Sequence, residues 1–254
     1  MLLVLDVGNT HTVVGIFRDD KIAAQWRLHT NSKRTEDELH MHMDWFFAQN
    51  GLQFTDIDKT VISCVVPPMI QALDAYCRKY LRHRPHWIGP GVVDMPICYR
   101  NPREVGADRL VNAVAAYEKY RTSLVIIDFG TATTFDCISE KGEYLGGAIS
   151  PGIGISAEAL FQRASKLPRV ELFDPPASVI GKETAESMKS GLLYGYAELV
   201  DGMVKRIRKE MAPPPPRVIA TGGLAPLLGK LSETIEAVEP ELTLEGLRLI
   251  SKKL

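Results

Sequence analysis

Two acidic turns in this sequence carry the residue types that a phosphate-binding site needs. Residues 6–10 read DVGNT after an apolar run, and residues 128–134 read DFGTATT after a second apolar run. Glycine lets a backbone N–H approach a phosphate oxygen closely, and threonine hydroxyls add further hydrogen-bond donors. A lone DxGNT is equally well explained by an ordinary tight turn. The case for chemistry therefore depends on its repetition.

The two turns lie about half the chain apart in matching surroundings. The segment LVLDVGNTHTVVGIF, residues 3–17, aligns without a gap to VIIDFGTATTFDCIS, residues 125–139. Both read as strand, Asp, apolar residue, Gly, polar turn and strand. Such a match indicates an internal duplication and two similar half-molecules, which we place at residues 1–117 and 118–254.

Other phosphate-binding signatures are absent from the sequence. No GxxxxGK[ST] occurs, which excludes a Walker P-loop, and no GxGxxG follows the first strand, which argues against a Rossmann dinucleotide site. Neither acidic turn contains lysine, so charge neutralisation at the phosphates is expected to come from a metal. Asp6 is the natural contact for Mg²⁺, directly or through water, because Mg²⁺ prefers oxygen ligands and keeps several waters.

The strands and helices predicted from the sequence must position these turns. The sequence predicts an opening hairpin over Leu2–Phe17 and a capped helix over Glu36–Gln49, where TEDE at 35–38 has capping-box spacing. Further strands are expected at Lys21–Leu28, Thr60–Val66, Glu143–Ile149 and Arg217–Ala220, and a long helix at Glu186–Lys209. Ligands of α/β folds gather at the carboxyl ends of strands. The two acidic turns and a third glycine turn, TGGLA at 221–225, all follow apolar strands.

Composition fits a soluble globular protein. The 254 residues are 45% hydrophobic and 24% charged, with a formal net charge of −1, so neither nucleic acid nor a membrane surface is expected as a partner. The four cysteines have no CxxC spacing, which favours free thiols in a reducing compartment. The N-terminus lacks the basic region and the long apolar run of a signal peptide. We therefore expect a cytoplasmic protein.

Five motifs taken together resemble the type III pantothenate kinases. They are DVGNT, GADR at 106–109, DFGTATTFD at 128–136, GGAISPG at 146–152 and TGGLA. More broadly, the duplicated Asp-Gly hairpins with the late TGGLA resemble the superfamily of acetate and sugar kinases, actin and heat-shock ATPases. The resemblance implies an α/β fold of two similar ribonuclease H-like domains, each a mixed sheet flanked by helices. It also implies transfer of the ATP γ-phosphate to the hydroxyl of pantothenate, the first step towards coenzyme A, by a homodimer that needs a monovalent cation, K⁺ or NH₄⁺.

The resemblance also implies roles for individual residues. The ATP phosphates are matched by Asp6, Val7, Gly8, Asn9, Thr10, His11, Thr12 and Val13, with Thr131 as a further ATP contact. The proton acceptor is matched by Asp108 and the monovalent-cation ligand by Asp128. Pantothenate contacts are matched by Tyr99, Gly106, Ala107, Asp108, Arg109 and Thr184, the last of which the family allows to come from a partner subunit. The family gives no firm expectation for His11.

Each of these roles has a structural alternative. Asp108 also suits a helix N-terminus, where a carboxylate complements the helix dipole. Arg109 suits a solvated surface charge, Asp128 a turn-capping carboxylate, and Thr184 the start of a helix. At the level of function, the alternatives are an accessory regulator that kept the fold and an ATP or polyphosphate hydrolase. A regulator is expected to have lost one of Asp6, Asp108 and Asp128, and all three are present.

Overall fold

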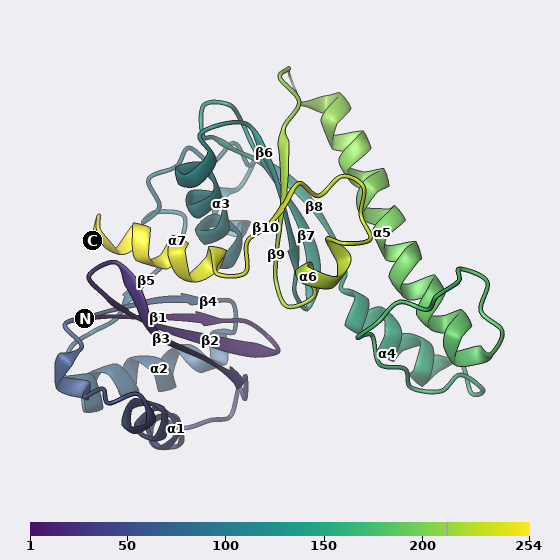
Figure 1. The fold of residues 1–254 in the computed structure, drawn as a ribbon. Helices are drawn as coiled ribbons and strands as arrows, with labels where there is room; N and C mark the ends of the chain where they lie inside the picture. The colour runs from purple at the N-terminus through teal and green to yellow at the C-terminus, as the bar shows by residue number, and fades with distance from the viewer. Residues whose placement is uncertain (212) are drawn as a thin grey trace. The chain divides into compact units, whose positions relative to one another are not determined.

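A computed structural model describes residues 1–211 and 213–254 and divides the chain into two compact units. Unit 1 comprises Met1–Met95, Tyr99–Glu118 and Leu242–Leu254, and unit 2 comprises Pro96–Cys98 and Lys119–Glu241. Each unit is built on one five-stranded mixed sheet with flanking helices (Figure 1). This confirms the predicted class of two similar α/β domains.

The sheet of unit 1 has the strand order β3-β2-β1-β4-β5. Strands β1, β2 and β3 form an antiparallel meander, whereas β4 and β5 run parallel to β1. The strands are β1 Leu2–Val7, β2 His11–Arg18, β3 Lys21–His29, β4 Lys59–Cys64 and β5 His86–Trp87. The helices are α1 Glu36–Gln49, α2 Ile70–Tyr76, α3 Ala107–Tyr120, whose last two residues fall in unit 2, and α7 Leu242–Ser251.

Helices cover both faces of this first sheet. One face packs against α1 and α2 in a core that includes Leu5, Trp26 and Phe47. The other face meets α7, because a Cβ at Gly15 would lie 3.2 Å from Leu244. Helix α1 begins and ends at the predicted residues, and the capping box between Thr35 and Glu38 is present. The local sequence signals were sufficient here because the helix start is fixed by hydrogen bonds within four residues.

The sheet of unit 2 has the order β10-β9-β6-β7-β8. Read from β8 to β10, it repeats the first sheet, with three antiparallel strands followed by two parallel ones. Its strands are β6 Leu124–Phe129, β7 Ala132–Ile138, β8 Tyr144–Pro151, β9 Arg217–Thr221 and β10 Ala237–Val238. Its helices are α4 Ile153–Arg163, α5 Thr184–Glu210 and α6 Ala225–Leu228. Residues from α4, α5 and α6 share one core with the strands, so these three helices cover the same face of the sheet.

The two hairpins differ by one residue in the length of the turn. In the first, Val7 pairs with Thr12, whereas in the second, Phe129 pairs with Thr133. The ungapped alignment of the two segments is therefore wrong beyond the turn, because the second turn is one residue shorter. With the gap in place, Thr12 corresponds to Thr133, and both side chains are buried.

The contacts divide the chain differently from a single cut between 1–117 and 118–254. The internal boundary falls at 118/119, within α3 and next to the predicted position. However, α7 at the end of the chain returns to the first sheet, where Leu244 meets the face that carries Gly15. Conversely, residues 96–98 belong to unit 2, because the Cys98 N–H donates to the Tyr144 carbonyl at 2.8 Å. Both exceptions come from long-range packing that periodicity in the sequence does not report.

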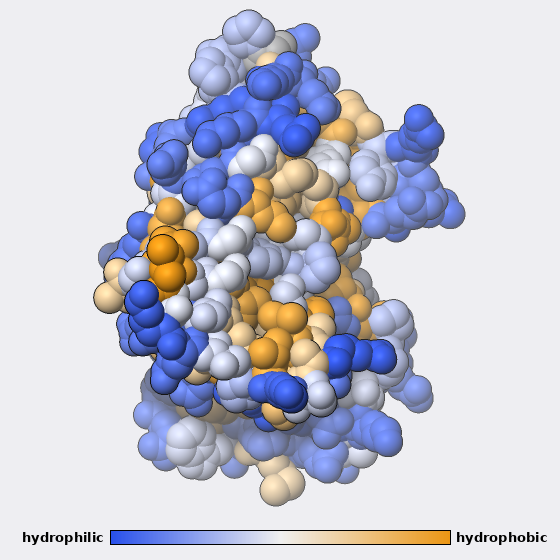
Figure 2. Space-filling view, turned by 90° about the vertical axis from the view of Figure 1, so that its right-hand side faces the viewer, coloured by the Kyte–Doolittle hydropathy of each residue, from blue (hydrophilic) through white to orange (hydrophobic). Residues whose placement is uncertain are grey.

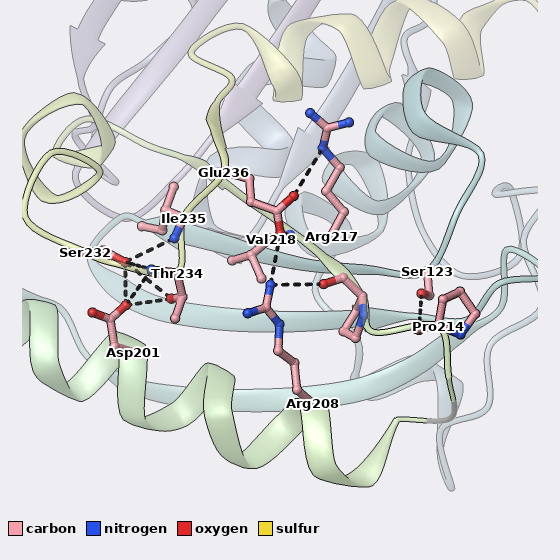
Figure 3. A network of polar contacts seen from close by, with 11 residues as sticks. Ser123, Asp201, Arg208, Pro214, Arg217, Val218, Ser232, Thr234, Ile235 and Glu236 are labelled. Atoms are coloured by element: carbon pink, nitrogen blue, oxygen red, sulfur yellow. Dashed lines mark hydrogen bonds and ion pairs between the residues drawn. The ribbon is translucent and has the colours of Figure 1, made fainter.

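A polar network fastens the middle of α5 to the segment before β10 (Figure 3). Asp201 is 1% exposed and accepts hydrogen bonds from the hydroxyls of Ser232 and Thr234 at 2.5 and 2.6 Å. It also accepts from the backbone N–H groups of Glu233 and Thr234 at 2.9 and 3.1 Å. A buried carboxylate with four donors is fully satisfied, so it fixes this segment against α5.

None of the helices in the described ranges combines the length and the apolar character that crossing a membrane requires.

Candidate active site

Backbone hydrogen bonds fix the turn after Asp6, both within the turn and to the segment after β3. The Gly8 N–H donates to the His11 carbonyl at 3.0 Å, and the Thr30 N–H donates to the Thr10 carbonyl at 2.9 Å. The hydroxyls of Thr12 and Thr30 are hydrogen-bonded at 2.9 Å in the interior. The side chains of Asn9, Thr10 and His11 are exposed, which leaves this turn accessible to a ligand.

Two members of the predicted ATP segment have no exposed side chain. Val7 is fully buried in the core, and Thr12 is 2% exposed beneath the turn. Any contact that these two residues make with a nucleotide would therefore use backbone atoms. The Thr12 hydroxyl braces the turn through Thr30 instead.

The second acidic turn has the same closure and is backed by two glycines. The Gly130 N–H donates to the Ala132 carbonyl at 3.1 Å, and the Gly152 N–H donates to the Thr131 carbonyl at 3.1 Å. A Cβ at Gly152, the N-cap of α4, would lie 2.3 Å from that Thr131 carbonyl oxygen. Gly152 thus lets the start of α4 approach the turn. In the sequence, only the Pro151-Gly152 pair indicates this close approach.

Gly222 of the late glycine turn lies against Asp128. Strands β6 and β9 are parallel neighbours, and Asp128 pairs with Thr221. A Cβ at Gly222 would lie 2.6 Å from Asp128 Oδ1 and 2.7 Å from the Phe129 carbonyl oxygen. The close approach of the late glycine turn to the Asp128 carboxylate therefore requires a residue without a side chain at position 222.

Two oxygens at the end of β6 lie beside Gly222. Asp128 Oδ1 and the Phe129 carbonyl oxygen lie 2.6 and 2.7 Å from the position that a Cβ of Gly222 would take. Within the described ranges, no group of three or more His, Cys, Asp or Glu residues is placed to hold a metal. Each acidic turn therefore offers one carboxylate plus backbone oxygens. That donor set suits hard cations, which complete their coordination with water and phosphate oxygens.

Asp108 stands in the first turn of α3 with its carboxylate half-buried. Its Oδ1 accepts a hydrogen bond from the Arg109 N–H at 2.8 Å. Burial raises the pKa of Asp108, and the backbone N–H and positive charge of Arg109 oppose that shift only in part. The contact with the Arg109 N–H is compatible with the capping alternative, while burial accounts for the direction of the shift. The raised pKa marks a stronger base than an ordinary aspartate.

The other predicted substrate residues are placed in both units. Tyr99, half-buried, and the segment Gly106–Arg109 belong to unit 1, together with the turn after Asp6. Arg109 is only 8% exposed, so the alternative of a solvated surface charge is wrong. Thr184 belongs to unit 2, where it is the exposed first residue of α5. Thr184 therefore does begin a helix, as its alternative role requires, and this position does not exclude a contact with substrate.

Comparisons with known proteins place the chain in one family. A family model described as type III pantothenate kinase matches residues 2–206. The type III pantothenate kinase of Desulfatibacillum aliphaticivorans is 61% identical over 98% of this chain and 97% of its own. That of Desulforapulum autotrophicum is 60% identical over 99% and 96%.

Solved structures show the fold at low sequence identity. Component A of the (R)-2-hydroxyglutaryl-CoA dehydratase of Acidaminococcus fermentans has a TM-score of 0.59 at 14% identity, covering 99% of this chain and 98% of its own. The inorganic polyphosphate/ATP-glucomannokinase of an Arthrobacter species has a TM-score of 0.52 at 14% identity, covering 100% and 99%. Given the matching family model and the full-length relatives, the chain belongs to the type III pantothenate kinase family.

Proposed function

We propose that this protein transfers the γ-phosphate of ATP to the primary hydroxyl of pantothenate and so forms 4′-phosphopantothenate, the first step of coenzyme A synthesis. Membership of the type III pantothenate kinase family supports the reaction. The observation that carries the catalytic assignment is Asp108, a half-buried carboxylate with a raised pKa at the start of α3.

Asp108 acts as the base in this proposal. Its carboxylate accepts a hydrogen bond from the substrate hydroxyl and orients the oxygen towards the γ-phosphate. It takes the proton as the new P–O bond forms and the bond between the γ-phosphorus and the bridging oxygen breaks, which releases ADP. A raised pKa brings the carboxylate closer to the working pH and makes it a better proton acceptor. Phosphoryl transfer otherwise depends on positioning and charge stabilisation.

Pantothenate is held by the residues around Asp108. Arg109, buried beside the base, pairs with the pantothenate carboxylate, because a guanidinium fork binds a carboxylate through two parallel hydrogen bonds. Gly106 and Ala107 supply backbone contacts, and Tyr99 and Thr184 supply hydroxyls. Thr184 is exposed, which is compatible with its acting on the substrate of a partner subunit.

ATP is bound by residues 6–13 and by Thr131. The exposed Asn9, Thr10 and His11 contact the phosphates, and Asp6 holds Mg²⁺ directly or through water. Asp128 with neighbouring backbone oxygens holds K⁺ or NH₄⁺. When bound, these cations neutralise phosphate charge, which the lysine-free turns do not provide.

A homodimer in the cytoplasm is the expected working form. Unit 2 exposes large apolar side chains on β8, on α4 and in the segment before α5, namely Ile149, Ile155, Leu160, Phe173, Val179 and Ile180. Figure 2 looks at the side on which α4 and α5 lie in Figure 1 and shows apolar patches among polar ones. Exposed apolar clusters of this kind mark interaction surfaces. Sedimentation should give twice the 28.2 kDa chain mass.

One assay tests the reaction. Purified protein is incubated with ATP, Mg²⁺, K⁺ and pantothenate, and the products are separated by mass spectrometry. We expect ADP and phosphopantothenate in equal amounts. ATP loss that ignores pantothenate would indicate the hydrolase, and no turnover would indicate the regulator. Replacement of K⁺ by Na⁺ should depress the rate, and an unchanged rate would contradict the cation role of Asp128.

A further inference from the structure

Arg27 on β3 lies in the same cross-strand row as Asp6. In the first sheet, Asp6 pairs with Val13 on β2, and Val13 pairs with Arg27 on β3. Neighbouring strands are about 4.8 Å apart, which puts the backbone of Arg27 about 10 Å from that of Asp6. An arginine side chain extends far enough to cover much of this separation.

Arg27 and Asp6 also point to the same face of the sheet. Their neighbours Trp26 and Leu28, and Leu5 and Val7, belong to the core under α1 and α2. Successive side chains of a strand alternate between faces, so Arg27 and Asp6 both point away from that core. Helix α7 covers this face at the Val4–Gly15 pair. That pair lies two residues before the Asp6–Val13 pair along β1.

The side chain of Arg27 is exposed, and together with His11 and His29 it forms a basic corner of the first sheet. No carboxylate in the described ranges forms an ion pair with Arg27. His11 and His29 are cross-strand partners whose rings meet edge to face at 6.4 Å between centroids. Burial lowers the pKa of His11, and the positive charges of Arg27 and His29 lower it further, which shows that Arg27 lies within electrostatic reach of the turn.

We propose that Arg27 is a phosphate-binding residue of the ATP site, where its guanidinium binds the triphosphate held by the turn after Asp6. This inference rests on the proposed function, because it takes that turn as the phosphate site. It supplies the fixed cation that neither acidic turn contains. A guanidinium presents a planar fork of donors that matches two phosphate oxygens, which an ammonium group cannot do.

The test compares three full-length variants: Arg27→Ala, Arg27→Lys and Lys21→Ala. Lys21 is a matched control, because it is an exposed cation of the same strand but pairs with Arg18 at the opposite end. Mg·ATP and pantothenate affinities are measured separately by calorimetry, and thermal melting checks the fold. Arg27→Ala should raise the Kd for Mg·ATP by about tenfold or more, as loss of a charged hydrogen bond predicts.

Specific outcomes decide the proposal. Pantothenate affinity and melting temperature should stay at the native values, Arg27→Lys should recover part of the ATP affinity, and Lys21→Ala should bind like the native protein. Native Mg·ATP affinity in Arg27→Ala, or an equal loss for ATP and pantothenate, would overturn it. Since nucleotide affinity is read without turnover, a protein that bound ATP through Arg27 but made no phosphopantothenate would refute the proposed function alone.

Discussion

Gly106 lies directly against the carboxylate of Asp108. A Cβ at residue 106 would come within 2.5 Å of Asp108 Oδ1, whereas the next nearest atom is 3.7 Å away. The close atom is the end of a side chain rather than backbone. Any substituent at 106 would therefore move the proposed base and leave the helix in place.

The Gly106→Ala variant should lose activity without losing stability. We expect kcat to fall by at least about tenfold, because a displaced carboxylate no longer meets the substrate hydroxyl in the reactive geometry. Steady-state kinetics with thermal melting measure both quantities. Gly91→Ala is the control, since nothing lies within 4 Å of a Cβ there, and it should match the native enzyme. A melting temperature that falls together with kcat would point to a structural role.

The Asp108→Asn variant should abolish transfer but keep ATP binding. Loss of a general base typically costs about 10² to 10⁴ in rate. The raised folded-state pKa means that the ionised carboxylate destabilises the native protein at neutral pH. The asparagine variant should therefore melt at the native temperature or above. Lower stability with weaker ATP binding would show that Asp108 is structural.

The pH dependence of the reaction follows from the same shift. The carboxylate accepts a proton only when ionised, and burial raises its pKa above the ordinary value of 3.8. As pH falls, kcat/KM for pantothenate should therefore decline at a higher pH than for an ordinary aspartate. An acid limb at or below the ordinary value would contradict the predicted environment of Asp108.

The Gly222→Ala variant should weaken both the fold and the cation response. Gly222 has φ +93°, a region that side chains rarely adopt, and its Cβ would collide with Phe129 backbone and Asp128. A backbone in such a region costs about 1–3 kcal/mol with a side chain present. Denaturant unfolding and a K⁺ titration of activity measure the two effects. Gly154→Ala, an open position on α4, should show neither.

Removal of the Asp201 carboxylate should destabilise unit 2 (Figure 3). Burial by itself would raise its pKa, but hydrogen bonds from Ser232, Thr234 and the backbone of Glu233 and Thr234 outweigh burial and lower it. Asp201→Ala leaves several buried donors unsatisfied, at about 1–3 kcal/mol each, so a loss of several kcal/mol in urea unfolding is expected.

Acid should reproduce part of that loss in the native protein. A lowered folded-state pKa contributes stability that is present above the ordinary aspartate value and is lost as pH falls through the lowered pKa. The difference in unfolding free energy between native protein and Asp201→Ala should therefore shrink in that acid range. A difference that stays constant down to the lowest measurable pH would contradict the assignment.

Features encoded within a few residues were predictable from the sequence. The capping box at Thr35, the repeated Asp-Gly hairpins and most strand positions follow from local patterns. The shorter second turn escaped detection, because ungapped similarity between the segments hid the missing residue. The burial of Arg109 could not be predicted from the sequence, since a charged side chain is rarely fully buried.

The basic corner at Arg27 shows why part of the site was missed. Arg27 belongs to neither acidic turn in the sequence. Only the register of β1, β2 and β3 brings it into the cross-strand row of Asp6. Sequence motifs describe residues that are neighbours along the chain. A sheet creates neighbours across strands, and their identity depends on a register that a bulge or turn of one residue can change.

The return of α7 to the first sheet imposes an order on biosynthesis. Unit 2 lies within residues 96–241, so all of its chain has left the ribosome before α7 emerges. The first sheet, although translated first, keeps the face of Val4 and Gly15 without its helix until Leu242–Ser251 have been translated. Domains generally fold as units during synthesis. In this chain, vectorial translation favours the reverse order, in which the N-terminal unit is begun first and finished last.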